Sequence, residues 1–448
     1  MDLKVFKEEL FKVAKAQGFE ECEIYYSDSE SLSINIYEGE VEKYKLNNSF
    51  GLSFRGKING KMGYSYTEIV DEDAIDMLVK NAKGAALSIE NDDVQFIYEG
   101  DSEYTEIDSY INELDKIQPD KLISLAMEME SECKKQCDKV VNFQGCGMGY
   151  GKSTYGIINS KGLELKNSRN HLTAYVAPVI EDNNEKYDGM GYVVAQSIDD
   201  VKPNKLAEDG LKEALSRIGG KSIASGKYKV VINNEAMVSL LGTFDSIFNA
   251  EQAQKGLSLL KDKEGEMIAS DIVTIIDDPH MKNGLGSCSF DDEGVATYKK
   301  EVVSNGKFNT FLYNLKTANK AGVKSTGNGF KASYASVVGI DGTNFYIKPG
   351  DKSFDEICAE VKEGLIVTEF AGLHSGASAV TGDFSLAAKG FMIENGKKTF
   401  PVEQITVAGN FFTLLKDIKM IGNDLKFPMS SIGSPCVFVK ELSVAGKE

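Results

Sequence analysis

The sequence predicts a multi-domain α+β protein, with an N-terminal helix-plus-hairpin α/β region and a mostly β C-terminal domain with a few helices. Two observations support this fold class. The chain has 448 residues, whereas a single hydrophobic core stops growing near ~250 to 300 residues. Runs of alternating apolar residues, typical of strands, are mixed with a few stretches of helical period and do not alternate with them as they would in a doubly wound sheet.

The sequence divides into three predicted domains. We expect an N-terminal α+β domain at residues 1–95, a central α+β domain at 110–220 and a C-terminal domain at 226–448. The polar and irregular segment 92–110 separates the first two domains. The segment 221–227 is typical of a linker into the third.

The N-terminal domain should begin with an amphipathic helix, because apolar residues recur at helical spacing and Gly18 follows as a stop. The apolar period then changes to two. Asn59-Gly60 stands between alternating runs and predicts a hairpin, because both turn positions need positive φ. The expected elements are a helix, a strand, a pair of strands and a helix, at residues 3–17, 31–37, 50–66 and 73–87.

In the central domain, helices should begin at Pro119 and Pro203, on either side of a strand-rich region at 140–195. Four glycines alternate inside that strand region and do not open a helix. Close packing of a glycine face therefore explains them better than nucleotide binding. They are Gly145, Gly147, Gly149 and Gly151.

The C-terminal domain should open with a strand at 228–232 and a helix from Glu235 to about Phe248. Two further Asn-Gly turns, each followed by Lys, then frame a mostly β region that also holds short helices. The turns lie at Asn305-Gly306 and Asn395-Gly396, and the helices near 312–321 and 353–363.

Composition argues against several classes of partner. The formal net charge is −18, and no run of Lys or Arg could neutralise a row of phosphates, so nucleic-acid binding is disfavoured. The charged start and the lack of an apolar run near ~18 residues predict a protein that is neither exported nor in a membrane. The cysteines lack a CxxC pair, which indicates reduced thiols and a cytoplasmic location. They lie at positions 22, 133, 137, 146, 288, 358 and 436.

The sequence offers few residues for familiar hydrolytic chemistry. Its histidines are His171, His280 and His374, and none lies in an HExxH or HExxxH pattern. A helix-borne zinc site is therefore not expected, although a site assembled from distant ligands stays open. His374 precedes Ser375, but neighbouring side chains on one strand point to opposite faces and no GxSxG occurs. A serine nucleophile is thus disfavoured, and His280 is interpreted as a turn residue.

Two acidic runs are the remaining candidates for cation binding. They are Asp277-Asp278 and Asp291-Asp292-Glu293. Carboxylate oxygens suit Ca²⁺ or Mg²⁺, but the spacing of an EF-hand loop is missing. We favour solvated turns, or a capping and hydrogen-bonding role.

A series of short motifs runs through the C-terminal half in a specific order and spacing. Each is weak alone, but together they cover roughly 180 residues, and the chain resembles the TldD/PmbA family in them and in its N-terminal helix-plus-hairpins plan. The motifs are Asp277-Asp278-Pro279, Gly284-Leu285-Gly286-Ser287, Phe290-Asp291-Asp292-Glu293-Gly294-Val295, Asn305-Gly306-Lys307, Ser325-Thr326-Gly327-Asn328, Lys348-Pro349-Gly350, Thr381-Gly382-Asp383-Phe384-Ser385, Ile393-Glu394-Asn395-Gly396 and Val407-Ala408-Gly409-Asn410.

The resemblance implies a three-part organisation and a role in a cytoplasmic proteolytic complex. In that family, the TldD-type subunit holds zinc through an HExxxH helix and a later Cys, with the motif Glu as general base. The PmbA (TldE) type lacks these ligands and pairs with the zinc-bearing subunit. Family members are linked to cleavage of unfolded peptides and to maturation of peptide antibiotics, and an old name connects them with DNA gyrase.

Carried over position by position, the zinc ligands are missing here. Gly242 and Ile247 stand where the two His would be, Thr243 where the Glu would be, and Ala387 is the equivalent of the Cys. Small and apolar side chains cannot bind Zn²⁺ or activate a water. The resemblance therefore implies no metal or other cofactor, and no catalytic residue, in this chain.

The leading hypothesis is a PmbA/TldE-type, non-catalytic subunit that completes the substrate groove of a TldD-like zinc peptidase. Glycines around 284–294, 327–329 and 372–382 would let an extended peptide approach the backbone, although they equally fit turns and bulges. Asn328, Asp383 and Ser385 are the candidate groove-lining residues. Two alternatives stay open: a homodimeric peptide-binding or scaffold protein without peptidase activity, and a hydrolase with an unrecognised site.

Overall fold

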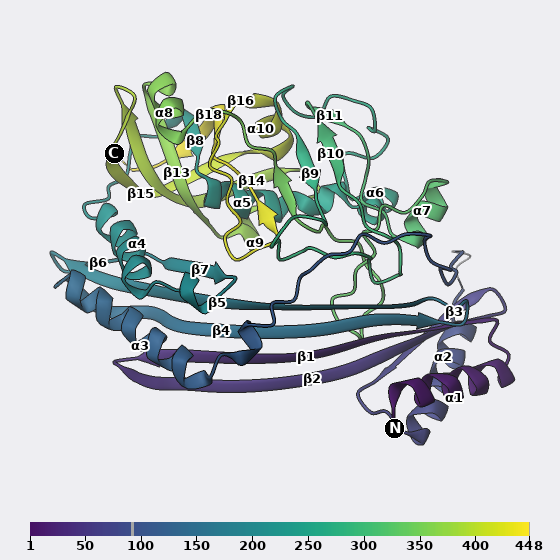
Figure 1. Ribbon diagram of the computed structural model, residues 1–448. Helices are drawn as coiled ribbons and strands as arrows, with labels where there is room; N and C mark the ends of the chain where they lie inside the picture. The colour runs from purple at the N-terminus through teal and green to yellow at the C-terminus, as the bar shows by residue number, and fades with distance from the viewer. Residues whose placement is uncertain (91–93, 448) are drawn as a thin grey trace.

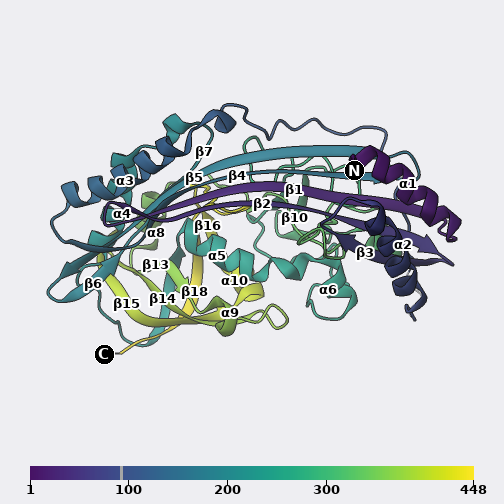
Figure 2. The ribbon, with the colours of Figure 1, turned by 90° about the horizontal axis from the view of Figure 1, so that it is seen from below.

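The structure is a computed structural model that describes residues 1–90 and 94–447. The chain forms one long curved sheet, which has helices on one side and the C-terminal domain on the other (Figure 1). The view from below shows the same long strands running past the C-terminal domain (Figure 2). The predicted fold class, multi-domain α+β, is confirmed.

The long sheet has the strand order β3-β2-β1-β4-β5-β6, and β7 also pairs with β5. β1 pairs antiparallel with both β2 and β4, so strands of the predicted N-terminal and central domains lie side by side in one sheet. The strands are β1 (Glu21–Tyr37), β2 (Glu40–Ile58), β3 (Lys61–Thr67), β4 (Val140–Asn159), β5 (Glu164–Asp182), β6 (Glu185–Asp188) and β7 (Gly191–Ala195).

One face of this sheet is apolar and covered by helices. Even-numbered residues such as Ile34, Met148 and Leu172 are buried against helices at one end, and Ile24 and Phe54 are buried at the other. Successive residues of a strand point to opposite faces, so the even positions form the core. The helices are α1 (Leu3–Ala16), α2 (Glu72–Leu87), α3 (Pro119–Gln136) and α4 (Pro203–Ser216), with short 3₁₀ turns η1 (Leu114–Lys116) and η2 (Ile198–Asp200).

The opposite face carries the odd-numbered residues and looks toward the C-terminal domain. Strand pairing places Ser31 beside Gly151, and Gly151 beside His171. A Cβ on Gly151 would lie 2.7 Å from the His171 ring, and one on Gly147 would lie 2.3 Å from the Ile34 carbonyl oxygen. The alternating glycines therefore serve close packing, which confirms their interpretation as a packed glycine face.

The C-terminal domain contains two sheets, ordered β15-β14-β13-β8-β18-β16 and β11-β10-β9-β12-β17. They share a core with α5, in which the rings of Phe244 and Phe411 stack at 4.5 Å. The strands are β8 (Gly226–Ile232), β9 (Ile275–Asp277), β10 (Lys300–Ser304), β11 (Lys307–Phe308), β12 (Phe345–Ile347), β13 (Gly364–Ala371), β14 (Asp383–Glu394), β15 (Lys397–Asn410), β16 (Ile418–Ile421), β17 (Ile432–Gly433) and β18 (Val437–Ala445).

Helices of the C-terminal domain are short, and the side chain of Asn233 caps α5 by accepting from the Ala236 N–H at 2.8 Å. The helices are α5 (Asn234–Phe244), η3 (Asp245–Phe248), α6 (Ala250–Gln254), α7 (Leu315–Ala321), α8 (Phe354–Val361), α9 (Leu373–Gly376) and α10 (Phe411–Asp417). None of the helices among the described residues is long and apolar enough to cross a membrane.

Local sequence signals predicted these elements well. The first helix ends at Ala16, and the helices predicted from Pro119 and Pro203 begin at those residues. The Asn-Gly hairpins are confirmed, with positive φ at both turn residues, as at Asn59 (51°) and Gly60 (75°).

Three expectations are wrong in detail. The strand expected at 31–37 begins at Glu21, because pairing with two neighbours extends it through a polar stretch. The helix expected to reach Phe248 ends at Phe244, where η3 follows. The segment 372–376, treated as a strand, is the helical turn α9, which starts after Gly372 with its φ of +81°.

Candidate functional site

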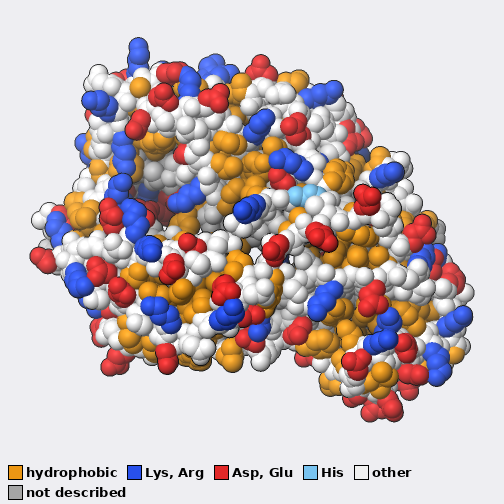
Figure 3. Space-filling model, viewed as in Figure 1, with side chains coloured by type: hydrophobic (Ala, Val, Ile, Leu, Met, Phe, Trp, Pro, Cys, Tyr) orange, Lys and Arg blue, Asp and Glu red, His pale blue; other side chains and the backbone are white. Residues whose placement is uncertain are grey.

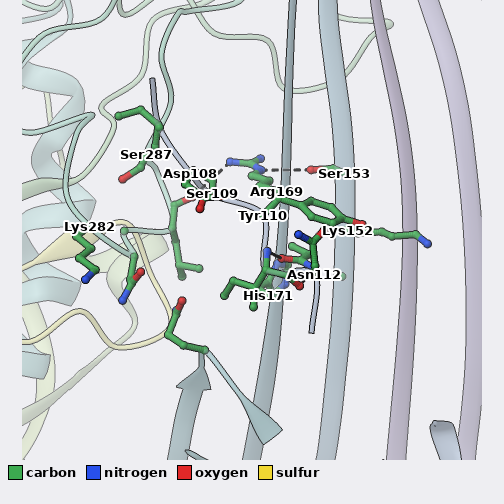
Figure 4. Close-up of a pocket in the computed structure, with 18 of the residues that line it drawn as sticks. Asp108, Ser109, Tyr110, Asn112, Lys152, Ser153, Arg169, His171, Lys282 and Ser287 are labelled. Atoms are coloured by element: carbon green, nitrogen blue, oxygen red, sulfur yellow. Dashed lines mark hydrogen bonds between the residues drawn. The ribbon is translucent and has the colours of Figure 1, made fainter. Parts of the chain in front are cut away.

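A groove separates the odd-numbered face of the long sheet from the C-terminal domain. Three cavities form it, and the largest of these three has a volume of about 940 Å³. The floor is formed by small side chains of β1 and β4, including Ser29, Ser31 and Ser153. The walls are the segment 106–113 and the C-terminal loop 280–287 (Figure 4). In the space-filling view, histidine is visible where the C-terminal domain meets the sheet (Figure 3).

Asn170 fixes the wall segment 106–113 along the edge of β5. Its side chain accepts from the Ile111 N–H at 2.8 Å and donates to the Ile111 carbonyl at 2.9 Å. The Asn170 N–H donates to the Ser109 carbonyl at 3.3 Å. Asp115 accepts from the hydroxyl groups of Tyr110 and Tyr150 just beyond. This wall is therefore preformed rather than a loose loop.

Two smaller cavities continue this space toward α5. A cavity of about 480 Å³ shares Arg169, Leu285 and Met429 with the largest one. A third, of about 360 Å³, shares Asp341 and Ser431 with the second. We call the three together the interdomain groove. It extends from β5 of the long sheet to the end of α5.

Buried charges join the sheet to the C-terminal domain beside the groove. Arg55 of β2 donates to Glu23 at 2.6 Å and to Glu293 of the C-terminal domain at 3.3 Å. The backbone N–H of Lys331 donates to the Asp292 carboxylate at 2.8 Å. Burial raises the pKa of Asp292 to about 6, and burial together with the charge of Arg55 lowers the pKa of Lys331 to about 8. These groups hold the two bodies in one arrangement.

Asp245 borders the far end of the groove, directly after α5. Burial, with the neighbouring charge of Asp341, raises the pKa of Asp245 to about 7. The pKa of Asp341 is also raised, mainly by burial. This end of the groove can hold the Asp245 carboxyl as a neutral hydrogen-bond donor near neutral pH.

None of the four residues at the expected zinc positions lines the three cavities, and they differ in their surroundings. Gly242 and Thr243 are half-buried on α5, and the Thr243 hydroxyl donates to the Ser239 carbonyl at 2.8 Å. Ile247 is in the hydrophobic core with 1% of its surface exposed. Ala387 is exposed, because Leu386 points into the core that α5 shares, and the next residue points the other way.

These residues do not fit a zinc ion. Gly242, Ile247 and Ala387 carry no donor atom in their side chains, and the hydroxyl of Thr243 is engaged within its own helix. Within the part of the chain that the structure describes, no group of three or more His, Cys, Asp or Glu side chains is placed to hold a metal ion. No chemistry through a metal is therefore derived for this chain.

The three candidate groove residues are separated. Asn328 is fully buried and already bonded, because its amide donates to Asp277 at 2.9 Å and to the Asp341 carbonyl at 2.8 Å. Asp383 and Ser385 are exposed on β14, where Asp383 accepts from Asn410 at 2.9 Å. None of the three is among the residues that line the three cavities.

The structure brings together two histidines that the sequence left apart. His171 and His280 both line the largest cavity, whereas His374 lies on α9. His280 follows Pro279 in a turn, as predicted. Burial, with the charge of Arg169, lowers the pKa of His171.

The acidic runs are not solvated turns, and that part of the expectation is wrong. Asp277 and Asp291 are each 0% exposed. Their expected hydrogen-bonding role is confirmed, since Asp277 accepts from Lys300 at 2.9 Å and Asp291 from the N–H groups of Glu293 and Gly329. Buried carboxylates must be paired in this way to offset the loss of water.

Sequence reasoning missed Arg169, Asp245 and Lys331, although all three line the groove. A signal for Arg169 existed, because it shares an alternating strand with His171 and therefore its face. Asp245 and Lys331 had no local signal, since their positions depend on contacts with distant parts of the chain.

Three domain families match the chain in sequence. The PmbA/TldA metallopeptidase domain 1 matches residues 22–86, the central domain 112–218 and the C-terminal domain 225–446. The chain is 28% identical to Metalloprotease PmbA of Escherichia coli O157:H7, over 95% of this chain and 92% of that protein. It is also 28% identical to a Metalloprotease TldD homolog of Buchnera aphidicola, over 55% of this chain and 54% of that protein.

Solved structures agree with this assignment. A proposed modulator of a DNA gyrase from Thermotoga maritima is 33% identical, with a TM-score of 0.92 over 99% of this chain and all of that one. TldE from Thermococcus kodakarensis, at 21% identity, shares the fold with a TM-score of 0.90 over 98% of this chain and all of that one. This chain belongs to the PmbA/TldD family.

Proposed function

We propose that this protein is a TldE/PmbA-type, non-catalytic subunit of a cytoplasmic zinc-peptidase complex that cleaves unfolded peptides. The observation that carries the proposal is the donor set at the end of α5. Where a TldD-type chain would present two His and a Glu, this chain has Gly242, Ile247 and Thr243, and none of these can bind zinc or activate water.

The groove supports a role in holding substrate. Its floor has small serine side chains, which let a polypeptide backbone approach the sheet closely. It extends toward Asp245 at the end of α5, next to the degenerate motif. In the complex, this subunit contributes peptide-binding surface and the partner contributes the metal.

A free strand edge supports assembly with another chain. Among the described residues, β3 pairs with β2 only at residues 52–58, so the part of β2 before Gly51 pairs with β1 on one side and with no other strand of that part of the chain (Figure 1). This stretch exposes Val41, Tyr44 and Leu46, the last with 55% of its surface accessible. An exposed edge strand presents unpaired N–H and C=O groups with which another chain can pair. The same edge equally fits a second copy of this chain, as in the alternative of a homodimeric peptide-binding protein.

The cysteines agree with a reducing compartment. All seven are free thiols, and six of them are buried. Disulfides would be expected in an exported protein that used its cysteines for stability.

The test is a peptidase assay on the purified chain, on a zinc-bearing TldD-type relative, and on their mixture, with an unfolded peptide as substrate. We expect no hydrolysis by this chain alone and at least ~10-fold more in the mixture than with the relative alone. Hydrolysis by this chain alone that survives a chelator would refute the proposal. A stable homodimer that neither binds nor stimulates the relative would favour the alternative.

A further inference from the structure

Arg169 differs from the other two arginines of the chain in its partners. Arg55 and Arg217 each contact two or more carboxylates within 3.4 Å. Around Arg169, no carboxylate of the described residues lies within 4.0 Å, although the chain has 68 acidic residues. A guanidinium without a carboxylate partner has N–H groups that can bind an anionic ligand.

Two neutral acceptors hold the guanidinium in a fixed orientation. Nε donates to the Ser153 hydroxyl at 3.3 Å and Nη1 to the Leu285 carbonyl at 3.3 Å. Figure 4 shows the bond to Ser153 across the floor of the cavity. Nη2 has no acceptor among the residues that the structure describes. Arg169 is also exposed and borders both larger cavities, so a ligand there can reach it.

Arg169 is the unpaired cation of the floor, whereas Lys282 belongs to the wall formed by the C-terminal loop. His171 lies two residues away on the same strand face, and burial with the charge of Arg169 lowers its pKa, which disfavours a positive charge on its ring. Lys152 points away from Arg169 and is paired with Glu30 at 3.2 Å (Figure 4). The wall segment 106–113 contributes the carboxylates of Glu106, Asp108 and Glu113 to the same cavity, and Asp292 of the adjoining cavity interacts with the charge of Arg169 at longer range.

We propose that Arg169 binds a carboxylate of the peptide in the interdomain groove, so that the peptide is anchored at β5 while the rest of its chain extends toward α5. The proposal rests on the proposed function, because it assumes that the groove holds peptide. The free Nη2 and the second hydrogen of Nη1 match the geometry of a carboxylate. The carboxylate is either the C-terminus of the peptide or an acidic side chain near its end.

The test compares three peptides on the full-length chain by titration calorimetry. They are N-acetylated hexa-alanine with a free carboxylate, the same peptide as its C-terminal amide, and an amide that ends in Glu. We expect the free acid to bind at least ~10-fold more tightly than the plain amide. The Glu amide shows which source of carboxylate is used, since it binds like the free acid only if a side chain suffices.

Variants separate the anchor from general charge. Arg169→Met should remove the preference for the free acid and leave binding of the amide unchanged, and Arg169→Lys should retain only part of the preference. Lys152→Met, which removes an already paired cation from the same cavity, should keep the full preference. Circular dichroism checks that each variant is folded.

Three outcomes would overturn the anchor. A preference for the free acid that persists in Arg169→Met contradicts it, as does equal binding of acid and amide to the unaltered chain. The second result leaves peptide binding by the groove intact. If no peptide binds, both the anchor at Arg169 and the peptide-binding role of the groove are refuted. The need for a zinc-bearing partner is tested separately by the peptidase assay.

Discussion

Buried carboxyl groups set how single residues respond to pH in this protein. Asp245 lies at the end of the groove, and burial with the nearby charge of Asp341 raises its pKa from 3.8 to about 7. Between these two values the folded chain holds a proton that the unfolded chain has lost. Stability from this group is therefore present below pH 3.8 and is lost as the pH rises through about 7.

Replacing Asp245 with Asn should remove that dependence. Between pH 4 and 7, the free energy of unfolding of the unaltered chain should fall as the pH rises, and that of Asp245→Asn should lack this contribution. We expect the difference between the two slopes to reach up to ~1 kcal/mol per pH unit. Denaturant unfolding at a series of pH values measures this difference. Asp383→Asn, at an exposed site, is the control and should follow the unaltered chain. Parallel curves for Asp245→Asn and the unaltered chain would contradict the assignment.

At the scale of single elements, the strands β1, β4 and β5 have two different faces, and each face has its own role. The even face is apolar and carries the helices, and the odd face is small and polar and forms the floor of the groove. The glycines of β4 lie on the odd face, where the lack of a side chain lets neighbouring groups pack closely. Their role is structural, and the groove depends on it indirectly.

Gly147→Ala tests this packing against a matched glycine. Its Cβ would lie 2.3 Å from the Ile34 carbonyl oxygen, so we expect a loss of about 1–3 kcal/mol in the free energy of unfolding. Gly84 lies exposed in α2 with nothing within 4 Å of a new Cβ, so Gly84→Ala should gain about 0.5–1 kcal/mol. Thermal or denaturant unfolding measures both. Equal effects of the two changes would show that the glycine face does not constrain the sheet.

At the scale of the whole molecule, the groove exists because buried charges fix the C-terminal domain over the sheet. Arg55 pairs with Glu23 in its own sheet and with Glu293 across the interface. Removal of one member of such a buried set leaves an uncompensated charge, which is costly. The domain arrangement is thus built into the chain, and the groove is open before any ligand arrives.

The sequence predicted what depends on neighbouring residues. Turns such as Asn59-Gly60 and helix starts such as Pro119 were found, because the chemistry that makes them is local. The first half of β1 was missed, since its polar stretch 27–31 is a strand only through pairing with β2 and β4. Arg169 was missed for a similar reason: its importance depends on the absence of a carboxylate partner, which only the folded chain reveals.

The family resemblance supplied what local patterns could not, namely where a metal would be expected. It assigned Gly242, Thr243 and Ile247 to the positions of a zinc motif, and in the structure Asp245, which directly follows α5, borders the groove. The candidates Asn328, Asp383 and Ser385 do not line the three cavities, because burial and strand direction could not be judged from motifs alone. Their assignment to peptide binding stays a prediction.

The most direct test of the account is the zinc content of the purified chain, measured by elemental analysis after dialysis and again after assembly with a zinc-bearing relative. We expect no stoichiometric zinc in the isolated chain, and one zinc per assembled pair, contributed by the partner. One tightly bound zinc per isolated chain would contradict the assignment as a non-catalytic subunit.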